Sequence, residues 1–128
     1  MKIKIKFFEK DFLEAIGAGV YEIDVNKNGK VAVLYIGESV FVLVRCSIHL
    51  YELRKSPQYL GFTQETINDE GITLTFKLLQ QEDKKKRRKE IETEEIKKKK
   101  PLSQKGINDY QKEVEDRIEA LTNFLKTL

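Results

Sequence analysis

The chain of 128 residues is 40% hydrophobic and has a formal net charge of +3, which fits one folded domain and excludes an intrinsically disordered protein. Its single cysteine, Cys46, excludes an internal disulfide and is expected to be a buried thiol, and no apolar run approaches the roughly 18 residues of a transmembrane helix. Because the first residues alternate lysine with isoleucine and form no secretory apolar segment, we expect a soluble, cytoplasmic protein with no membrane contact.

The N-terminal part of the sequence predicts three strands. Polar and apolar residues alternate over residues 2–8, which is typical of a half-buried strand. Residues 11–16 are expected to form a short helical turn capped by Asp11. Residues 20–25 and 30–36 predict two further strands, and an Asn-Gly pair between them is a strong hairpin signal.

A segment with two conflicting patterns follows the third strand. Residues 40–44 are β-branched or aromatic except for one leucine, which favours a strand. From Cys46 onward, apolar residues recur at spacings of four and three, which favours a helix. We predict that residues 40–53 are largely helical, because burial overrides local propensity, and that Ser39 is the N-cap.

The C-terminal half predicts one strand and two helices. Residues 72–78 alternate like a strand, and residues 82–100 are good helix formers that stop at Pro101. A last amphipathic helix begins at Ile107. Its apolar stripe consists of Tyr110, Val114, Ile118, Leu121, Leu125 and Leu128.

Together these elements predict an α+β fold, with a small, mostly antiparallel sheet flanked by helices. Residues 1–105 would form the domain, with an N-terminal strand extension, and residues 106–128 an extra C-terminal helix. The apolar stripe of that helix either packs on the domain or forms a homodimer interface. We expect packing on the domain, because amphipathic helices usually cover their own core.

Two tripeptides face each other across the predicted hairpin. Gly19-Val20-Tyr21 lies on one strand and Tyr35-Ile36-Gly37 on the next. This pair resembles the signature of the GIY-YIG endonuclease family, with valine in the middle of the first triplet. Ser39, Arg45 and His49 follow in the family's order and at its spacing.

A second stretch extends the resemblance. Residues 92–104 are similar to the end of the nuclease domain of the bacterial excision-repair endonuclease, with Glu92 at the metal-binding glutamate. Gln104 stands where that family has asparagine, and Glu38 stands where the repair enzyme has lysine. The resemblance covers residues 17–104 and implies a GIY-YIG-like fold.

The resemblance implies an enzyme that hydrolyses DNA phosphodiester bonds. Arg45 would stabilise the phosphate in the transition state, because its planar guanidinium donates two parallel hydrogen bonds and stays charged. His49 would orient the attacking water or bind a phosphate oxygen. Tyr21 or Tyr35 would activate or position that water, and the sequence leaves open which of them does so.

The resemblance also implies a divalent ion, Mg²⁺ or Mn²⁺, held by Glu92. Magnesium keeps most of its waters, so one carboxylate together with a substrate phosphate suffices. Glu94 and Glu95 lie so close in sequence that either is an alternative ligand. The supporting positions are Gly19, Gly37, Ser39 and Gln104.

Basic residues crowd both ends of the predicted helix that carries Glu92. The expected DNA contacts are Lys84, Lys85, Lys86, Arg87, Arg88, Lys89, Lys97 and Lys98. Such contacts with phosphates supply affinity and position but no sequence choice. No zinc finger or helix-turn-helix signature is visible, so sequence choice would need a separate targeting partner.

Two other functions compete with a nuclease. One is a catalytically idle module that binds nucleic acid with the same fold. It predicts that the residues of the motif would be lost, whereas Tyr21, Tyr35, Arg45, His49 and Glu92 are all present. The other is an interaction protein that dimerises through the last helix, which accounts for the apolar stripe but not for the motif.

Overall fold

The computed structural model describes the backbone of residues 1–104 and 110–127, and the side chains of residues 1–104 and 117–127. The strands are β1 (Lys4–Phe7), β2 (Gly19–Lys27), β3 (Lys30–Ser39) and β4 (Ile72–Gln81). The helices are α1 (Val42–Lys55), α2 (Lys85–Lys99) and α3 (Tyr110–Lys126), with short 3-10 turns η1 (Pro57–Leu60) and η2 (Thr66–Asn68).

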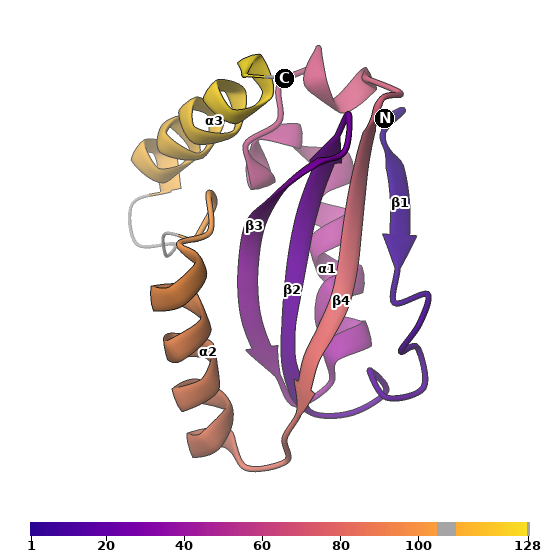
Figure 1. Cartoon of the computed structure of the whole chain (residues 1–128), viewed down its shortest axis with the longest axis vertical. Helices are drawn as coiled ribbons and strands as arrows, with labels where there is room; N and C mark the ends of the chain where they lie inside the picture. Colours follow the sequence, from indigo (N-terminus) through magenta and orange to yellow (C-terminus); the bar gives the residue numbers. More distant parts are fainter. Residues whose placement is uncertain (105–109, 128) are drawn as a thin grey trace.

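The four strands form one mixed sheet in the order β1-β4-β2-β3 (Figure 1). β1 runs parallel to β4, whereas β2 is antiparallel to both β4 and β3. In Figure 1, α1 lies behind the sheet, α2 stands beside β3, and α3 lies above α2. The predicted α+β class, with a mostly antiparallel sheet flanked by helices, is confirmed.

The predicted hairpin joins β2 to β3 through a two-residue turn. Asn28 and Gly29 occupy it with φ angles of 56° and 80°. Positive φ at both positions matches the twist of the flanking strands, and asparagine and glycine adopt it at little cost. The turn fixes the register that places Tyr21 opposite Gly37, and Ile23 opposite Tyr35.

The predicted helix over residues 40–53 exists, but its start differs from the prediction. α1 begins at Val42, Phe41 is in the N-cap position, and no side chain caps the helix. Ser39 is therefore not the N-cap, and its hydroxyl accepts a hydrogen bond from the Phe41 N–H at 3.0 Å. The amides of Val42 and Leu43 instead donate to backbone carbonyls of residues 17 and 15, at 2.8 and 3.1 Å. The preceding loop thus replaces a capping side chain.

The predicted helical turn at residues 11–16 is present as a single turn, but its predicted cap by the Asp11 side chain is wrong. This segment is a series of turns, in which the Ala15 N–H donates to the Asp11 carbonyl at 3.0 Å and the Ile16 N–H donates to the Leu13 carbonyl at 3.2 Å. The Asp11 carboxylate accepts the Leu78 N–H at 2.8 Å instead of capping a helix. It thereby binds an amide of β4 near the irregularity in the β2–β4 pairing.

The two faces of the sheet are covered by different helices. α1 buries Val42, Cys46, His49 and Leu53 in the main core, so the predicted burial of the free thiol is confirmed. On the other face, Ile91 of α2 packs with Val20 and Ile36. Leu121 and Leu125 of α3 belong to the main core, next to η1. The side chains of Tyr110 and Val114, and Leu128, lie outside the described residues.

A β-bulge in β3 turns Tyr35 toward α1. Ile23 pairs with Tyr35 but Asp24 pairs with Val33, so Leu34 is the extra residue. Leu34 and Tyr35 therefore both pack with the main core, whereas Val33 and Ile36 face α2. Bulges redirect side chains in this way next to functional sites. Among the described helices, none is long and apolar enough to cross a membrane.

Candidate active site

A chain of three hydrogen-bonded rings lies between the sheet and α1. The Tyr21 hydroxyl lies 2.7 Å from His49 Nε2, and His49 Nδ1 lies 2.9 Å from the Tyr59 hydroxyl. His49 is 1% exposed, so these two phenols satisfy both ring nitrogens where water does not reach them. The histidine is held in one orientation by partners on both sides.

The glycines of the motif permit close approach around these rings. A side chain at Gly37 would collide with the Tyr21 hydroxyl and would come within 2.9 Å of the Tyr35 ring. A side chain at Gly19 would come within 2.6 Å of the Gln80 carbonyl of β4. Glycine at both positions therefore lets the Tyr21 ring cross β3 and lets β2 lie close to β4.

Tyr35 lies beside this chain and is the more accessible of the two motif tyrosines. Its ring centroid is 5.1 Å from that of His49 and 6.2 Å from that of Tyr21. Tyr21 is 1% exposed, whereas Tyr35 is only partly buried. Of the two phenols, Tyr35 is the one that a substrate can reach.

Burial controls the protonation of both phenols. It raises the pKa of Tyr21 far above its ordinary value, and it also raises the pKa of Tyr35. The Arg45 guanidinium opposes burial at both residues and lowers each pKa. Both tyrosines are therefore neutral hydrogen-bonding groups at neutral pH, with a partly buried cation beside them.

Two residues of the site were missed by the sequence analysis. Tyr59 in η1 holds His49, and Arg117 of α3 donates a hydrogen bond to the Tyr59 carbonyl at 2.6 Å. The Arg117 guanidinium also lies 6.0 Å from the centre of the Tyr59 ring. A signal for Arg117 was present: it precedes Leu121 and Leu125 at intervals of four, so an arginine occupies the buried stripe of the last helix.

Glu92 lies on α2, which covers the other face of the sheet and contacts β3. Its carboxylate raises the pKa of Tyr35, so its charge acts on that phenol. The two alternatives point elsewhere: Glu94 is exposed on the outer side of α2, and Glu95 pairs with Lys99 at 3.2 Å. Of the three glutamates, Glu92 is the one whose charge acts on Tyr35.

The surroundings of Glu92 fit a metal ion that needs a single carboxylate. Its nearest cation is Lys89 at 3.9 Å, whereas Glu38 pairs with both Arg88 and Lys89 at 2.8 and 2.9 Å. Burial raises the pKa of Glu92, so its carboxylate is poorly solvated and lacks a close ion pair. The part of the chain that the structure describes has no group of three or more acidic, histidine or cysteine residues for a cage of protein ligands. A hydrated magnesium ion, which needs no such cage, fits this donor set.

Gln104 supports the strand that carries the second motif. Its side-chain oxygen accepts the Ile36 N–H at 2.7 Å, and its side-chain nitrogen donates to the Ile36 carbonyl at 2.9 Å. Leu102 and Ser103 donate backbone hydrogen bonds to residues 33 and 34 at 2.9 and 2.7 Å. The segment after α2 thus binds the outer edge of β3 as an added strand would.

The basic residues predicted to contact DNA divide into two groups. The exposed residues are Lys84, Lys85, Lys86, Arg87, Lys89, Lys97 and Lys98. Arg88 is buried: its guanidinium donates to Glu38 at 2.8 Å and to the backbone carbonyl of Asp83 at 2.7 Å. The predicted role of Arg88 in DNA contact is therefore wrong, because Arg88 lies on the buried face of α2.

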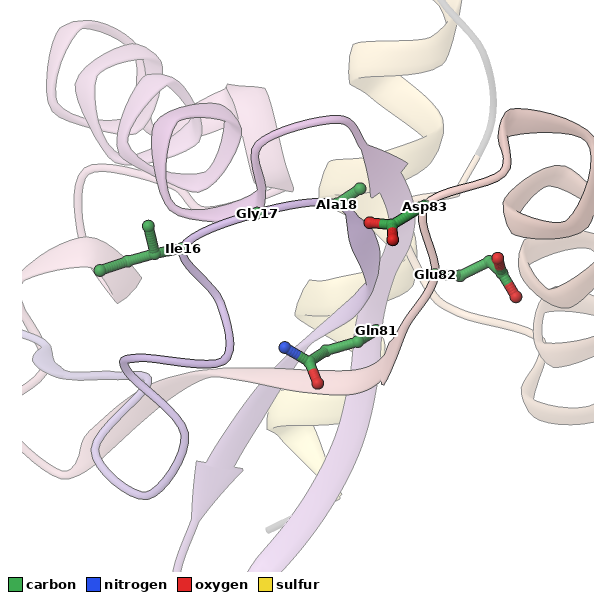
Figure 2. Close-up of a pocket in the computed structure, with 6 residues that line it drawn as sticks. All are labelled: Ile16, Gly17, Ala18, Gln81, Glu82 and Asp83. Atoms are coloured by element: carbon green, nitrogen blue, oxygen red, sulfur yellow. The ribbon is translucent and has the colours of Figure 1, made fainter.

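A pocket of about 340 Å³ lies at one end of the sheet, away from these rings (Figure 2). Figure 2 shows Glu82 and Asp83 on one side of it and Ile16 and Gly17 on the other. Its charged lining residues are both acidic, so it disfavours a phosphate. The Glu82 carboxylate is occupied there by the Lys84 N–H at 3.1 Å.

His49 makes the fold sensitive to acid. Burial lowers its pKa from 6.5 to about 3, so between these values the unfolded chain binds a proton that the folded chain does not. Stability is then complete above about pH 6.5 and falls by up to about 1.4 kcal/mol for each lower pH unit. We expect the difference in unfolding free energy between wild type and His49→Gln to shrink as the pH falls from 7 to 5 in urea titrations. A difference independent of pH would contradict a buried neutral histidine.

No family model, curated protein or solved structure matches the chain.

Proposed function

We propose that the protein is a metal-dependent endonuclease that hydrolyses DNA phosphodiester bonds, with a GIY-YIG-like fold. The observation that carries this proposal is the grouping of Tyr21, Tyr35, Arg45 and His49 between β2, β3 and α1. The charge of Glu92, on α2, also acts on Tyr35. Together with Glu92, these residues come from four elements that are separate in the sequence. Separate stretches that supply one chemical set to one place indicate a shared function.

Each of these residues has a separate role in the proposed hydrolysis. Arg45 is partly exposed beside the phenols, where it can bind a non-bridging phosphate oxygen. The Tyr35 hydroxyl positions the attacking water by a hydrogen bond, because its raised pKa makes it a poor base. Tyr21 and His49 are enclosed and fix the geometry of the site. When bound at Glu92, Mg²⁺ or Mn²⁺ would offset the negative charge that develops on the phosphate.

The decisive test is incubation of the purified chain with supercoiled plasmid in magnesium or manganese. We expect nicked and linear products that a chelator prevents. A chain that binds the plasmid without cutting it under either ion would contradict an endonuclease and favour the idle binding module.

The exposed lysines of α2 are expected to carry DNA affinity. Replacing Lys85 and Lys86 by glutamine should weaken binding and lower the slope of log affinity against log salt by about 0.9 per lost phosphate contact. Arg88→Gln is the comparison, because it should lower the melting temperature by leaving the Glu38 carboxylate without its buried partner. Gel shifts at several salt concentrations, with melting curves, measure both. An unchanged salt slope in the lysine variant would exclude this face from DNA contact.

A further inference from the structure

The outer side of α1 carries an apolar surface that no described side chain covers. Val44, Ile48 and Tyr51 follow one another at spacings of four and three and are 51%, 43% and 60% exposed. This stripe lies opposite the stripe that α1 buries in the core. A surface helix with apolar stripes on both sides has an unpartnered face.

The loop before β2 continues this surface. The amides of Val42 and Leu43 are bonded to carbonyls of residues 17 and 15, so the loop lies against the start of α1. Leu13 and Val40 are 76% and 73% exposed there. We call Leu13, Ile16, Val40, Val44, Ile48 and Tyr51 the α1 apolar surface.

The α1 apolar surface is large for an exposed patch on a single chain, although it is smaller than one side of a standard interface. Large side chains have areas of about 150–250 Å² each, so the exposed fractions of these residues correspond to several hundred square ångströms. A standard interface takes roughly 800 Å² from each partner. Apolar patches of this extent on a monomer usually mark an interaction site.

The charges at the two ends of the surface indicate what covers it. Glu14 is exposed at the loop end, and Arg54 and Lys55 are exposed at the other end of α1. Gln81 donates a hydrogen bond to the backbone carbonyl of Glu14 at 3.1 Å, which holds the loop that carries this residue. The Lys55 ammonium lies 5.3 Å from the centre of the Tyr51 ring, which places the basic end on the same stripe.

If a two-fold axis relates two copies of this surface, the acidic end of each copy faces the basic end of the other. With the axis near Ile48, two α1 helices pack antiparallel and each Glu14 approaches Arg54 and Lys55 of the other copy. The opposed helix dipoles add to the attraction. An anionic lipid surface would gain from the basic end but would be repelled by Glu14.

From this arrangement we propose that the protein forms a two-fold symmetric homodimer through the outer side of α1. The proposal does not depend on nuclease activity, because its test measures the mass of the assembly in solution. Leu121 and Leu125 of α3 lie in the core of the same chain, so these two residues do not contribute to the interface.

Sedimentation velocity from low to several hundred micromolar tests the association. We expect a dimer for wild type and for Val31→Glu, the matched control at a 57% exposed position on β3. Val44→Glu combined with Ile48→Glu should weaken dimerisation by about 100-fold or more, because it would bury unpaired charges. The melting temperature of the monomer should be unchanged.

A charge exchange tests the antiparallel geometry. Glu14→Lys should weaken the dimer, and adding Arg54→Glu and Lys55→Glu should restore it. A wild type that stays monomeric at every concentration would overturn the proposal, as would a dimer indifferent to the double glutamate variant. A monomer that instead sediments with vesicles of phosphatidylcholine and phosphatidylglycerol through these residues would assign the surface to lipid.

Discussion

Replacing Glu92 by glutamine is expected to abolish DNA cleavage while leaving DNA binding nearly intact. The amide has almost the shape of the carboxylate, and the side chain is partly exposed, so the fold should survive. It lacks the negative charge that would hold a divalent ion, so the rate should fall by about 10³-fold or more. The affinity should persist, because it rests on exposed lysines such as Lys85 and Lys86.

The matched control is Glu94→Gln, which makes the same change two residues away on the exposed side of α2. It should cleave at the wild-type rate. Plasmid nicking, gel shifts and melting curves on the three proteins separate chemistry, binding and stability. Cleavage by Glu92→Gln at the wild-type rate would remove Glu92 as the metal ligand. Loss of cleavage together with binding and melting temperature would show that Glu92 maintains the fold.

Local patterns in the sequence were sufficient for most of the elements. The turn at Asn28 and Gly29 follows from their tolerance of positive φ. The helix over residues 42–55 was predictable against the strand propensity of its first residues, because Cys46, Leu50 and Leu53 recur at the helical spacings of four and three. The first residue of this helix was not predictable. Loop carbonyls accept hydrogen bonds from the first amides of the helix, so no capping side chain marks its start.

The features of the site that escaped prediction depend on contacts between distant residues. The bulge at Leu34 decides which face Tyr35 occupies, yet strict alternation gives no sign of it. Arg88 looks like its basic neighbours in the sequence, and only the position of Glu38 on β3 makes it a buried partner. Tyr59 lies in a 3-10 turn, where no periodicity indicates that its hydroxyl meets His49.

The two motif tyrosines, which the sequence leaves equivalent, are expected to differ sharply when each is replaced by phenylalanine. Tyr35→Phe should lower the cleavage rate by about 10²- to 10⁴-fold, the usual range for a group that handles the attacking water. Its melting temperature should change little, because the ring stays and the residue is only partly buried. Tyr21→Phe should instead destabilise the fold by about 1–3 kcal/mol, since it leaves His49 Nε2 buried without its partner.

The comparison requires single-turnover cleavage at saturating DNA, at a temperature where both variants are folded, with urea titrations of each. Under those conditions Tyr21→Phe should retain most of its rate, because its hydroxyl is enclosed by His49 and Gly37 and does not face the substrate. The opposite pattern, a fast Tyr35→Phe and a folded but inactive Tyr21→Phe, would assign the water to Tyr21. It would also require the rings to open around a residue that is 1% exposed, so that a phosphate could approach the chain of hydrogen bonds from Tyr21 to Tyr59.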